Sequence, residues 1–444
     1  MTRLAEFGLL LLALLSLLLT APAASAQGTR GPLELRIEGA EFAPLPIAIL
    51  PFGAVEGLGQ EASDIATIVE ADLERSGLFR LISPAAFINE SLPFGTVPIF
   101  ANWRTLGAEA LITGRVLRAP DGRLQVQFRI YDVLGETEIS GLQLLGDPQA
   151  KRRIAHKVAD RIYQTLTGEG PYFDSQIAFV DVTGPKGDRR HRIAVMDQDG
   201  ANMRFLPGAD GLVLTPRLSP DAARVLYIAF DTGQPEIVIQ DIASGRRDRL
   251  GNFPGMSFAP RFSPSGEEVV LSLALEGNTD VYVLRLADRS LRRLTRNPGI
   301  DTGASFSPDG TEVVFESDRG GSQQLYVMSA TGGAARRISY GQGRYGTPVW
   351  SPRGDLIAFT KIQGGRFNIG VMRTDGSQER LLAEGFLVEG PSFAPNGRVL
   401  AFMQESPGPQ GAPRVMTIDV SGRNLRALPT PSAASDPAWS ALLP

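Results

Sequence analysis

Cysteine is absent from this sequence of 444 residues, and histidine occurs only twice, as His156 and His191. Without cysteine, no disulfide bond can stabilise the chain and no thiolate can bind a metal, so the fold depends on the burial of apolar side chains. Neither histidine has carboxylate residues near it in the sequence at the spacing of a metal site. The sequence therefore predicts no metal site at either histidine and no cofactor.

An excess of charge of one sign is also missing, because 44 lysine and arginine residues nearly balance 48 aspartate and glutamate residues. Binding to a phosphate backbone needs a basic surface, so the sequence gives no reason to expect nucleic acid as a partner. Two catalytic signatures are missing as well. No Gly-x-Ser-x-Gly segment occurs, and the glycine-rich residues 53–59 lack the lysine of a phosphate-binding loop.

The sequence has few long apolar runs, and the one that stands out extends from Phe7 to Leu19. Arg3 precedes this run and Ala24-Ser25-Ala26 follows it, which is the pattern of a secretory signal peptide. We predict that residues 1–26 form the signal and that cleavage between Ala26 and Gln27 releases the mature protein. The run is too short to cross a bilayer comfortably, so no membrane span is expected.

Residues 27–168 are predicted to form an α/β domain. A buried strand is expected over residues 45–52, and apolar residues at helical spacing predict helices over residues 61–76 and 148–166. Strict alternation of apolar and polar residues over residues 124–133 indicates a half-buried strand. Because this domain has no catalytic or cofactor motif, we interpret it as an interaction module, followed by a linker.

A repeated segment fills the rest of the chain. It consists of an apolar residue followed by Ser-Pro-Asp-Gly or a close variant, and it places prolines at Pro220, Pro264, Pro308, Pro352 and Pro395. The steps between these prolines are 44, 44, 44 and 43 residues. A period of this length, with several short strands in each repeat, is typical of an all-β propeller, which we assign to residues 169–444.

Both ends of the repeat region carry part of a blade. Residues 177–206 contain three strands without a first one, and Asp436 to Ser440 repeats the start of a blade. We therefore predict a six-bladed β-propeller that is closed by pairing of this terminal segment with the first blade. Four of the five Ser-Pro turns place a glycine at the left-handed position, so Asp221-Ala222, which lacks it, is expected to form a turn of another type.

Each turn follows a bulky residue that is expected to pack between adjacent blades. These residues are Leu218, Phe262, Phe306, Trp350 and Phe393. Asp301 and Asp436 lie in segments that should face the channel, and the sequence leaves open whether an ion such as calcium binds there. The Asp-x-Asp-Gly at residues 197–200 is interpreted as a β-turn, because it lacks the later glutamate of a calcium loop.

A propeller without catalytic residues favours a binding function. The alternative is a secreted propeller enzyme such as a polysaccharide lyase, which would need several histidines in the channel. With its signal peptide, small α/β domain, repeated Ser-Pro turns and final Pro-Ala-Trp-Ser segment, the chain resembles the TolB family, the periplasmic component of the Tol-Pal system.

The resemblance implies a non-enzymatic protein of the periplasm with two main partners. The lipoprotein Pal would bind at one mouth of the propeller channel, and the inner-membrane protein TolA would bind the mature N-terminal segment. Such a protein supports outer-membrane integrity and constriction of the envelope during cell division. Colicin-like toxins would use the same mouth as Pal.

The resemblance also assigns contacts to residues of this sequence. Pro216, Ala259 and Thr302 match Pal-binding positions of the family, whereas Met256 stands where many relatives have histidine. Glu389 and Asp436 are added because the predicted geometry places them at the same mouth.

The TolA-binding segment implied by the resemblance is residues 27–38. Gln27 begins it, and Leu33, Leu35 and Ile37 alternate with polar or charged residues toward its end. This alternation suits the addition of a strand to a partner's sheet. It equally suits an edge strand of the α/β domain itself, and the sequence does not decide between the two.

Overall fold

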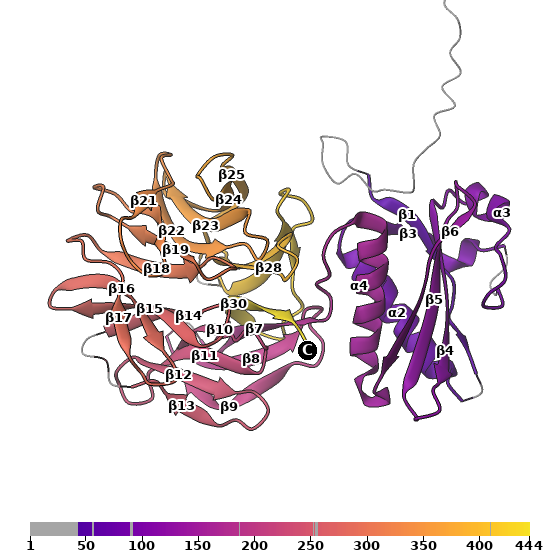
Figure 1. Cartoon of the computed structure of the whole chain (residues 1–444), viewed down its shortest axis with the longest axis horizontal. Helices are drawn as coiled ribbons and strands as arrows, with labels where there is room; N and C mark the ends of the chain where they lie inside the picture. The colour runs from indigo at the N-terminus through magenta and orange to yellow at the C-terminus, as the bar shows by residue number, and fades with distance from the viewer. Residues whose placement is uncertain are drawn as a thin grey trace, which may run out of the picture.

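A computed structural model describes residues 43–444 except residues 56, 89–91, 186, 252, 254–255 and 409. The predicted signal peptide, its cleavage site and the segment with Gln27, Leu33, Leu35 and Ile37 lie outside the described residues. The rest forms two bodies side by side, an α/β domain and a propeller, with one long helix of the domain turned toward the propeller (Figure 1). The predicted fold class is confirmed.

The sheet of the α/β domain has the strand order β3-β1-β4-β5-β6, in which β1 runs parallel to both of its neighbours. Its strands are β1 (Leu45–Ile49), β2 (Gly53–Ala54), β3 (Phe79–Leu81), β4 (Ala110–Arg118), β5 (Leu124–Asp132) and β6 (Thr137–Gly146). The short β2 pairs with the far end of β4. Side chains of β5 alternate between buried and half-buried along most of its length, as the alternation in the sequence predicts.

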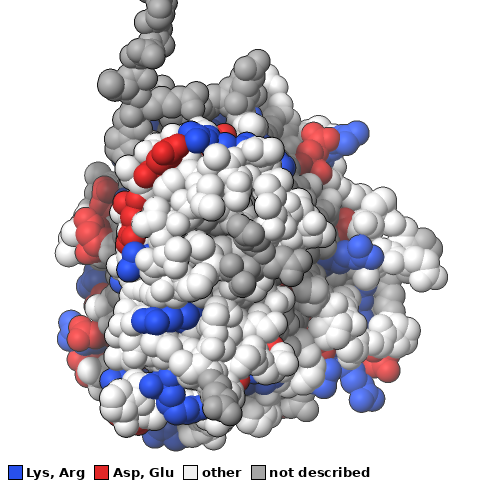
Figure 2. Space-filling view, turned by 90° about the vertical axis from the view of Figure 1, so that its right-hand side faces the viewer, with Lys and Arg blue, Asp and Glu red and all other residues white. Residues whose placement is uncertain are grey.

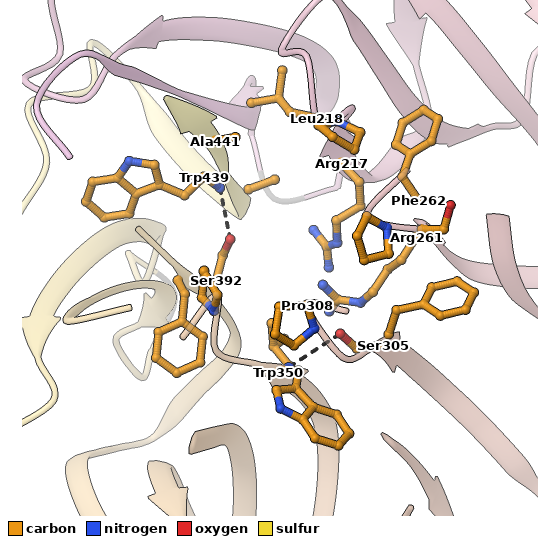
Figure 3. A pocket seen from close by; sticks show the side chains of 18 of the residues that line it. Arg217, Leu218, Arg261, Phe262, Ser305, Pro308, Trp350, Ser392, Trp439 and Ala441 are labelled. Carbon is orange, nitrogen blue, oxygen red and sulfur yellow. Dashed lines mark hydrogen bonds between the residues drawn. The ribbon is translucent and has the colours of Figure 1, made fainter. Parts of the chain in front are cut away.

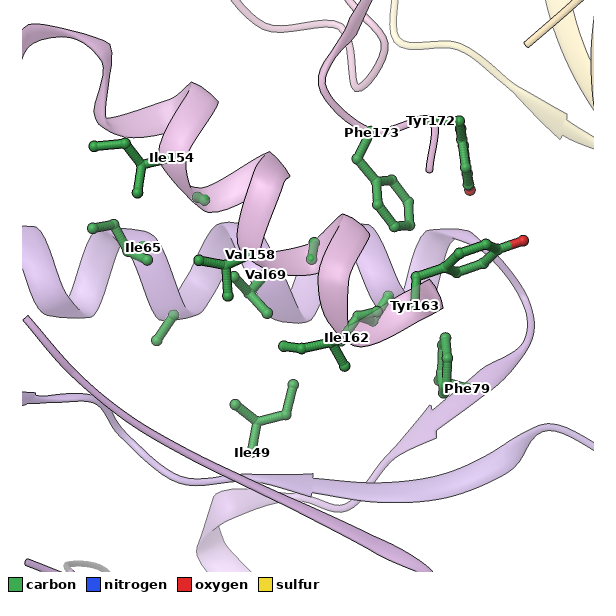
Figure 4. Packing of buried hydrophobic residues seen from close by; sticks show 14 of the residues in the cluster. Ile49, Ile65, Val69, Phe79, Ile154, Val158, Ile162, Tyr163, Tyr172 and Phe173 are labelled. Atoms are coloured by element: carbon green, nitrogen blue, oxygen red, sulfur yellow. The ribbon is translucent and has the colours of Figure 1, made fainter. Parts of the chain in front are cut away.

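Two long helices cover one face of this sheet. They are α2 (Gly59–Arg75) and α4 (Lys151–Thr167), which is preceded by the short η2 (Pro148–Ala150). Ile65 and Val69 of α2 interlock with Val158 and Ile162 of α4 above Ile49 of β1 (Figure 4). The opposite face carries η1 (Pro84–Ala86) and α3 (Phe100–Thr105), with the Trp103 ring buried against the sheet.

The face of the α/β domain that points away from the propeller carries its charges mostly at the margins (Figure 2). Several large apolar side chains of this domain are exposed, among them Ile88 at 60%, Val97 at 71% and Ile99 at 63%. No helix among the described residues combines the length and the apolar character needed to cross a membrane.

The propeller consists of six four-stranded antiparallel sheets, each with its innermost strand first. The first three sheets are β30 (Ala433–Leu442), β7 (Ser175–Thr183), β8 (Arg190–Asp197), β9 (Arg204–Gly211); β10 (Val213–Leu218), β11 (Arg224–Ala229), β12 (Glu236–Asp241), β13 (Arg247–Arg249); and β14 (Met256–Phe262), β15 (Glu268–Leu275), β16 (Asn278–Arg285), β17 (Leu291–Arg293). The others are β18 (Asp301–Phe306), β19 (Glu312–Ser317), β20 (Gln324–Ser329), β21 (Arg336–Arg337); β22 (Arg344–Trp350), β23 (Leu356–Gln363), β24 (Arg366–Arg373), β25 (Arg380–Gly385); and β26 (Leu387–Phe393), β27 (Val399–Glu405), β28 (Pro413–Asp419), β29 (Arg426–Ala427).

Strand β30 closes the ring, as the incomplete repeats at the two ends predict. Ala438 and Trp439 pair with Ala178 and Ile177 of β7. The Trp439 indole N–H also donates to Ser175 Oγ at 2.9 Å. Strand β30 is thus the innermost strand of the blade that also contains β7, β8 and β9, the earliest strands of the propeller.

The Ser-Pro turns are alike in all five copies. Gly266, Gly310, Gly354 and Gly397 take positive φ angles of 72°, 73°, 78° and 65°. The expectation of another turn at Asp221-Ala222 is wrong, because Ala222 takes the same conformation with φ of 54°. Its N–H donates to the Ser219 carbonyl at 2.8 Å, like the glycine N–H groups of the other turns. The Asp221 carboxylate accepts the Ser219 O–H and the Ala223 N–H, which helps to hold this conformation.

The bulky residues before the turns pack between blades, which confirms their predicted role. Trp350, for example, shares one buried cluster with Val314 and Val327 of the preceding blade and Ile357 and Phe359 of its own. Each blade-to-blade boundary therefore gains apolar burial, the main stabilising contribution to folding in a chain without disulfide bonds.

A short linker joins the two bodies, and Asp160 of α4 holds it. The Asp160 carboxylate accepts the backbone N–H groups of Tyr172 at 2.7 Å, Phe173 at 2.8 Å and Asp174 at 3.1 Å. Arg153 donates two further hydrogen bonds to Asp174, at 3.0 and 2.9 Å. Because one helix satisfies three consecutive N–H groups of the linker, the chain enters β7 in a fixed direction.

His156 has carboxylate neighbours in the structure, although none of these lies near it in the sequence. Its Nδ1 lies 2.6 Å from Asp72 Oδ2 of α2. Asp197 and Asp199 of the propeller reach the same place, where one oxygen of each and one imidazole nitrogen lie within 4.8 Å of one another. These residues meet only because the two bodies dock, which no local spacing in the sequence reveals. Arg152 pairs with both propeller aspartates, so the chain supplies a cation of its own here.

Candidate partner-binding site at the mouth of the propeller channel

A β-bulge interrupts the innermost strand of every blade. The pairing register shifts within β10, β14, β18, β22, β26 and β30, and in each strand one shift contains a residue with a left-handed backbone. These residues are Thr215, Ala259, Gly303, Thr347, Gly390 and Asp436, with φ angles between 46° and 66°. A bulge bends its strand and redirects the neighbouring side chains. Six equivalent bulges therefore form a ring around the channel, which we call the bulge ring.

The structure brings the predicted Pal-binding residues to this ring. Ala259 and Asp436 occupy the left-handed positions of their strands, and Pro216 directly follows Thr215. Thr302 and Glu389 directly precede the left-handed glycines of β18 and β26. Met256 is the first residue of β14, three positions before the bulge. The positions are thus brought together, while their contacts with a partner stay a prediction.

Carboxylates gather on one side of the bulge ring. Burial raises the pKa of the Glu389 carboxyl above its ordinary value, and the charges of Asp436 and Glu405 raise it further. Burial lowers the pKa of His191, as does the charge of Arg189, whereas Asp436 opposes both effects. A partner that approaches this side meets half-buried acidic groups close to one another.

A different carboxylate ties two bulges together beneath the surface. Glu316 of β19 accepts the Thr302 hydroxyl with Oε1 and the Thr347 backbone N–H with Oε2. The Thr302 hydroxyl is therefore engaged within the protein. Sequence reasoning missed Glu316, because nothing in the segment EVVFE distinguishes this glutamate from a solvated one.

Asp301 does not offer its carboxylate freely to the channel. It is fully buried and pairs with Arg319 of the same blade at 2.7 Å. The sequence left open whether an ion binds at Asp301 and Asp436. Such an ion would have to compete with the Arg319 guanidinium for the carboxylate of Asp301. Charge neutralisation by a neighbouring arginine is the simpler arrangement for a buried aspartate.

Two arginines that the sequence analysis passed over also face the channel. Arg217 and Arg261 each lie two residues after the left-handed residue of their strand and line a cavity at the end of the channel where the Ser-Pro turns meet. The signal was present in the repeats, since TPRLSP and APRFSP carry arginine where the other copies carry serine or valine.

This fold and this site define a β-propeller binding protein with an N-terminal α/β domain. Family comparison matches residues 163–443 to the TolB beta propeller domain and residues 33–139 to the TolB amino-terminal domain. The chain is 64% identical over 418 residues to the Tol-Pal system protein TolB of Paramagnetospirillum magneticum, which covers 93% of this chain and 94% of that protein. It is also similar to the crystal structure of TolB from Acinetobacter baumannii, with a TM-score of 0.78 and 29% identity, over 90% of this chain and 97% of that one.

The chain belongs to the TolB family. It is accordingly a non-enzymatic component of the cell envelope, and the alternative of a secreted propeller enzyme is wrong.

Proposed function

We propose that this protein acts in the periplasm within the Tol-Pal system, where it binds Pal at the bulge ring and TolA through its mature N-terminal segment. The observation that carries this proposal is the bulge ring, which holds five of the six candidate Pal contacts at or beside equivalent positions of the innermost strands. The name of the relative from P. magneticum, a Tol-Pal system protein, supports the assignment to that system. By linking the two partners the protein would support outer-membrane integrity and constriction during division.

The chemistry of the ring supports a folded protein as the partner at this mouth. Ala259 and Pro216 offer small and apolar surface on β14 and β10, whereas Glu389 and Asp436 offer carboxylates on β26 and β30. A complementary partner would place hydrogen-bond donors or a basic side chain against the carboxylates and an apolar group over the rest. Colicin-like toxins would gain entry by presenting the same groups.

Thr302→Arg tests the proposed face, because it adds bulk and charge at the bulge ring. We expect the affinity for purified soluble Pal, measured by calorimetry, to fall about 100-fold, as for other central contacts of an interface. Thr331→Arg is the matched control, since Thr331 is an exposed residue in an outer turn of the same blade. Full affinity of a folded Thr302→Arg variant would show that Pal binds elsewhere.

Deletion of residues 27–38 separates the two possible roles of the N-terminal segment. A segment that serves TolA should leave the melting temperature of the mature protein unchanged and abolish TolA binding. An edge strand of the α/β domain should instead lower the melting temperature.

Coupling between the two sites would appear as a difference in TolA affinity with and without saturating Pal. We propose that Pal occupancy biases the segment between a docked and a free state. Equal TolA affinities in the two conditions would refute the coupling while leaving both sites in place.

A further inference from the structure

A cavity of about 230 Å³ lies at the end of the channel where the Ser-Pro turns meet, beyond the bulge ring. Every blade contributes one equivalent residue to its wall, two positions after the left-handed residue. These six residues are Arg217, Arg261, Ser305, Val349, Ser392 and Ala438. Not one aspartate or glutamate is among the described residues that line the cavity.

The guanidinium groups of Arg217 and Arg261 lie side by side in this cavity (Figure 3). Arg217 donates through Nη1 to the carbonyl of the adjacent Pro216 at 2.8 Å, while its Nε is buried without a hydrogen-bond partner. The side chain of Arg261 has no hydrogen bond or ion pair with any residue that the structure describes. Two neighbouring cations without counter-ions repel each other at close range.

The electrostatics of the pair agree with this geometry. Burial lowers the pKa of Arg217, and only the charge of Asp436 opposes it. Burial also lowers the pKa of Arg261, and the charge of Arg217 lowers it further. Asp436 belongs to the bulge ring and forms no ion pair with Arg217 within the described part of the chain. Arginine stays protonated in proteins, so the cavity carries two positive charges.

Two serines across the cavity add neutral donors. Ser305 Oγ accepts the backbone N–H of Trp350 at 3.4 Å, and Ser392 Oγ accepts that of Trp439 at 2.9 Å (Figure 3). Each bond ties one blade to the next and uses an oxygen lone pair. The two hydroxyl hydrogens have no acceptor among the described residues, so they are available to a ligand in the cavity.

We propose that this cavity is an anion-binding site for a phosphoryl dianion, either inorganic phosphate or a phosphomonoester. The planar guanidinium groups can each bind two oxygens of such an anion, and the serine hydroxyls can donate to its remaining oxygens. Two positive charges match a dianion better than a monoanion. The site lies beyond the ring proposed for Pal, and its existence does not depend on that function.

Thermal unfolding of the mature protein in inorganic phosphate tests the site against sodium chloride at equal ionic strength. A ligand that binds only the folded state raises its stability, so phosphate at about 100 times its Kd should raise Tm by about 2–4 °C or more. Calorimetry should give one phosphate for each chain. Equal melting temperatures in phosphate and chloride would overturn the proposal.

Arg217→Gln and Arg261→Gln should each weaken phosphate binding at least about tenfold, since each removes a charged donor pair. Because each also relieves the repulsion between the two cations, the variants should melt no lower than the wild type in chloride. Arg414→Gln removes an exposed arginine of β28 and is the matched control, with unchanged phosphate binding. Phosphate binding that persists in the double variant would assign the anion to another place and overturn the site.

Glycerol phosphate distinguishes the two sources of the dianion. If glycerol phosphate binds at least as tightly as inorganic phosphate, the cavity has room for the glycerol substituent, which supports a phosphomonoester as the ligand. Binding of inorganic phosphate alone would support the free anion. Binding of each ligand can be followed as line broadening of its phosphorus resonance when the protein is added. If neither inorganic phosphate nor glycerol phosphate is broadened by the Arg217→Gln/Arg261→Gln variant, the site is supported, even if that variant melts at a lower temperature.

Discussion

Glu316 and Thr347 lie in adjacent blades and share a hydrogen bond, in which the Thr347 backbone N–H donates to Glu316 Oε2 at 2.7 Å. The Oε1 of the same carboxylate accepts the hydroxyl of Thr302. Burial raises the pKa of Glu316, and these hydrogen bonds oppose the rise. One half-buried side chain therefore links two neighbouring bulges, so the shape of the bulge ring depends on this carboxylate.

Replacing Glu316 by glutamine should weaken this link, because an amide has one acceptor oxygen and one donor group. Either Thr302 or Thr347 then loses its acceptor, and an unsatisfied buried donor costs about 1–3 kcal/mol. We expect urea unfolding to show a loss of that size, together with weaker Pal binding. Glu267→Gln, at an exposed glutamate of the neighbouring blade, should change neither. A Glu316→Gln variant with the stability and Pal affinity of the wild type would contradict the linking role.

The buried His156 should make the stability of the protein depend on pH. Burial alone lowers its pKa, but the hydrogen bond to Asp72 and the charges of Asp72, Asp199 and Asp197 outweigh burial and raise it above the ordinary value. A histidine with a raised pKa in the folded state stabilises the protein fully below its unfolded pKa of about 6.5. This contribution is lost as pH rises through the folded value.

His156→Gln should therefore remove a fall in stability that begins near pH 6.5 and continues as pH rises through the raised pKa of His156. His191 provides the matched comparison, because burial and Arg189 lower its pKa, so its effect has the opposite sign. Urea midpoints of wild type, His156→Gln and His191→Gln across this range would measure both. Parallel curves for wild type and His156→Gln would show that Asp72, Asp197 and Asp199 do not hold a proton on His156.

The linker should be sensitive to the number of acceptor oxygens at Asp160. Asp160→Asn keeps the oxygen that accepts from Tyr172 and Phe173 and turns the other into a donor facing the N–H of Asp174. We expect a loss of about 1–3 kcal/mol for asparagine and more for alanine, which leaves all three N–H groups without this acceptor. Differential scanning calorimetry would measure this, with Asp188→Asn at an exposed loop position as the control. Equal losses for asparagine and alanine would mean that the hydrogen bonds contribute little.

Removal of residues 436–444 should open the propeller. The truncation takes away most of β30, including the indole of Trp439 and its hydrogen bond to Ser175. Loss of a buried tryptophan alone costs about 3–5 kcal/mol, so we expect the cooperative thermal transition of the propeller to be lost or greatly lowered. Removal of Leu443 and Pro444 alone should keep the transition. A truncated protein that melts like the wild type would contradict closure by β30.

Much of the architecture could be predicted because the propeller repeats itself. Proline marks all five turns and glycine four of them, and a period near 44 residues is visible without any knowledge of contacts. Ala222 shows the limit of this reasoning. Its left-handed backbone is imposed by the surrounding hairpin and by Asp221, and a neighbouring sheet can enforce a conformation that alanine alone disfavours.

The parts of the sites that the sequence did not reveal are those made by distant residues. Asp72 and His156 meet because helices α2 and α4 pack together, and docking of the two bodies adds Asp199 of the propeller. Glu316 has a structural role because it accepts a hydrogen bond from Thr347 in a strand of the next blade. Arg217 and Arg261 are a different case, because the repeats show that they occupy equivalent positions in two blades. Equivalent positions do not by themselves reveal that the two side chains line one cavity.

The pairing of β30 with β7 also orders events in time. During synthesis, β30 (residues 433–442) is made after every other strand that the structure describes. Its partner strand β7 ends at Thr183, so β7 is made long before β30 can pair with it. The first blade therefore waits for its innermost strand while five later blades are made. An inner edge of β7 that stays unpaired for this long is open to wrong partners, so export and early folding must keep it covered until the final strand arrives.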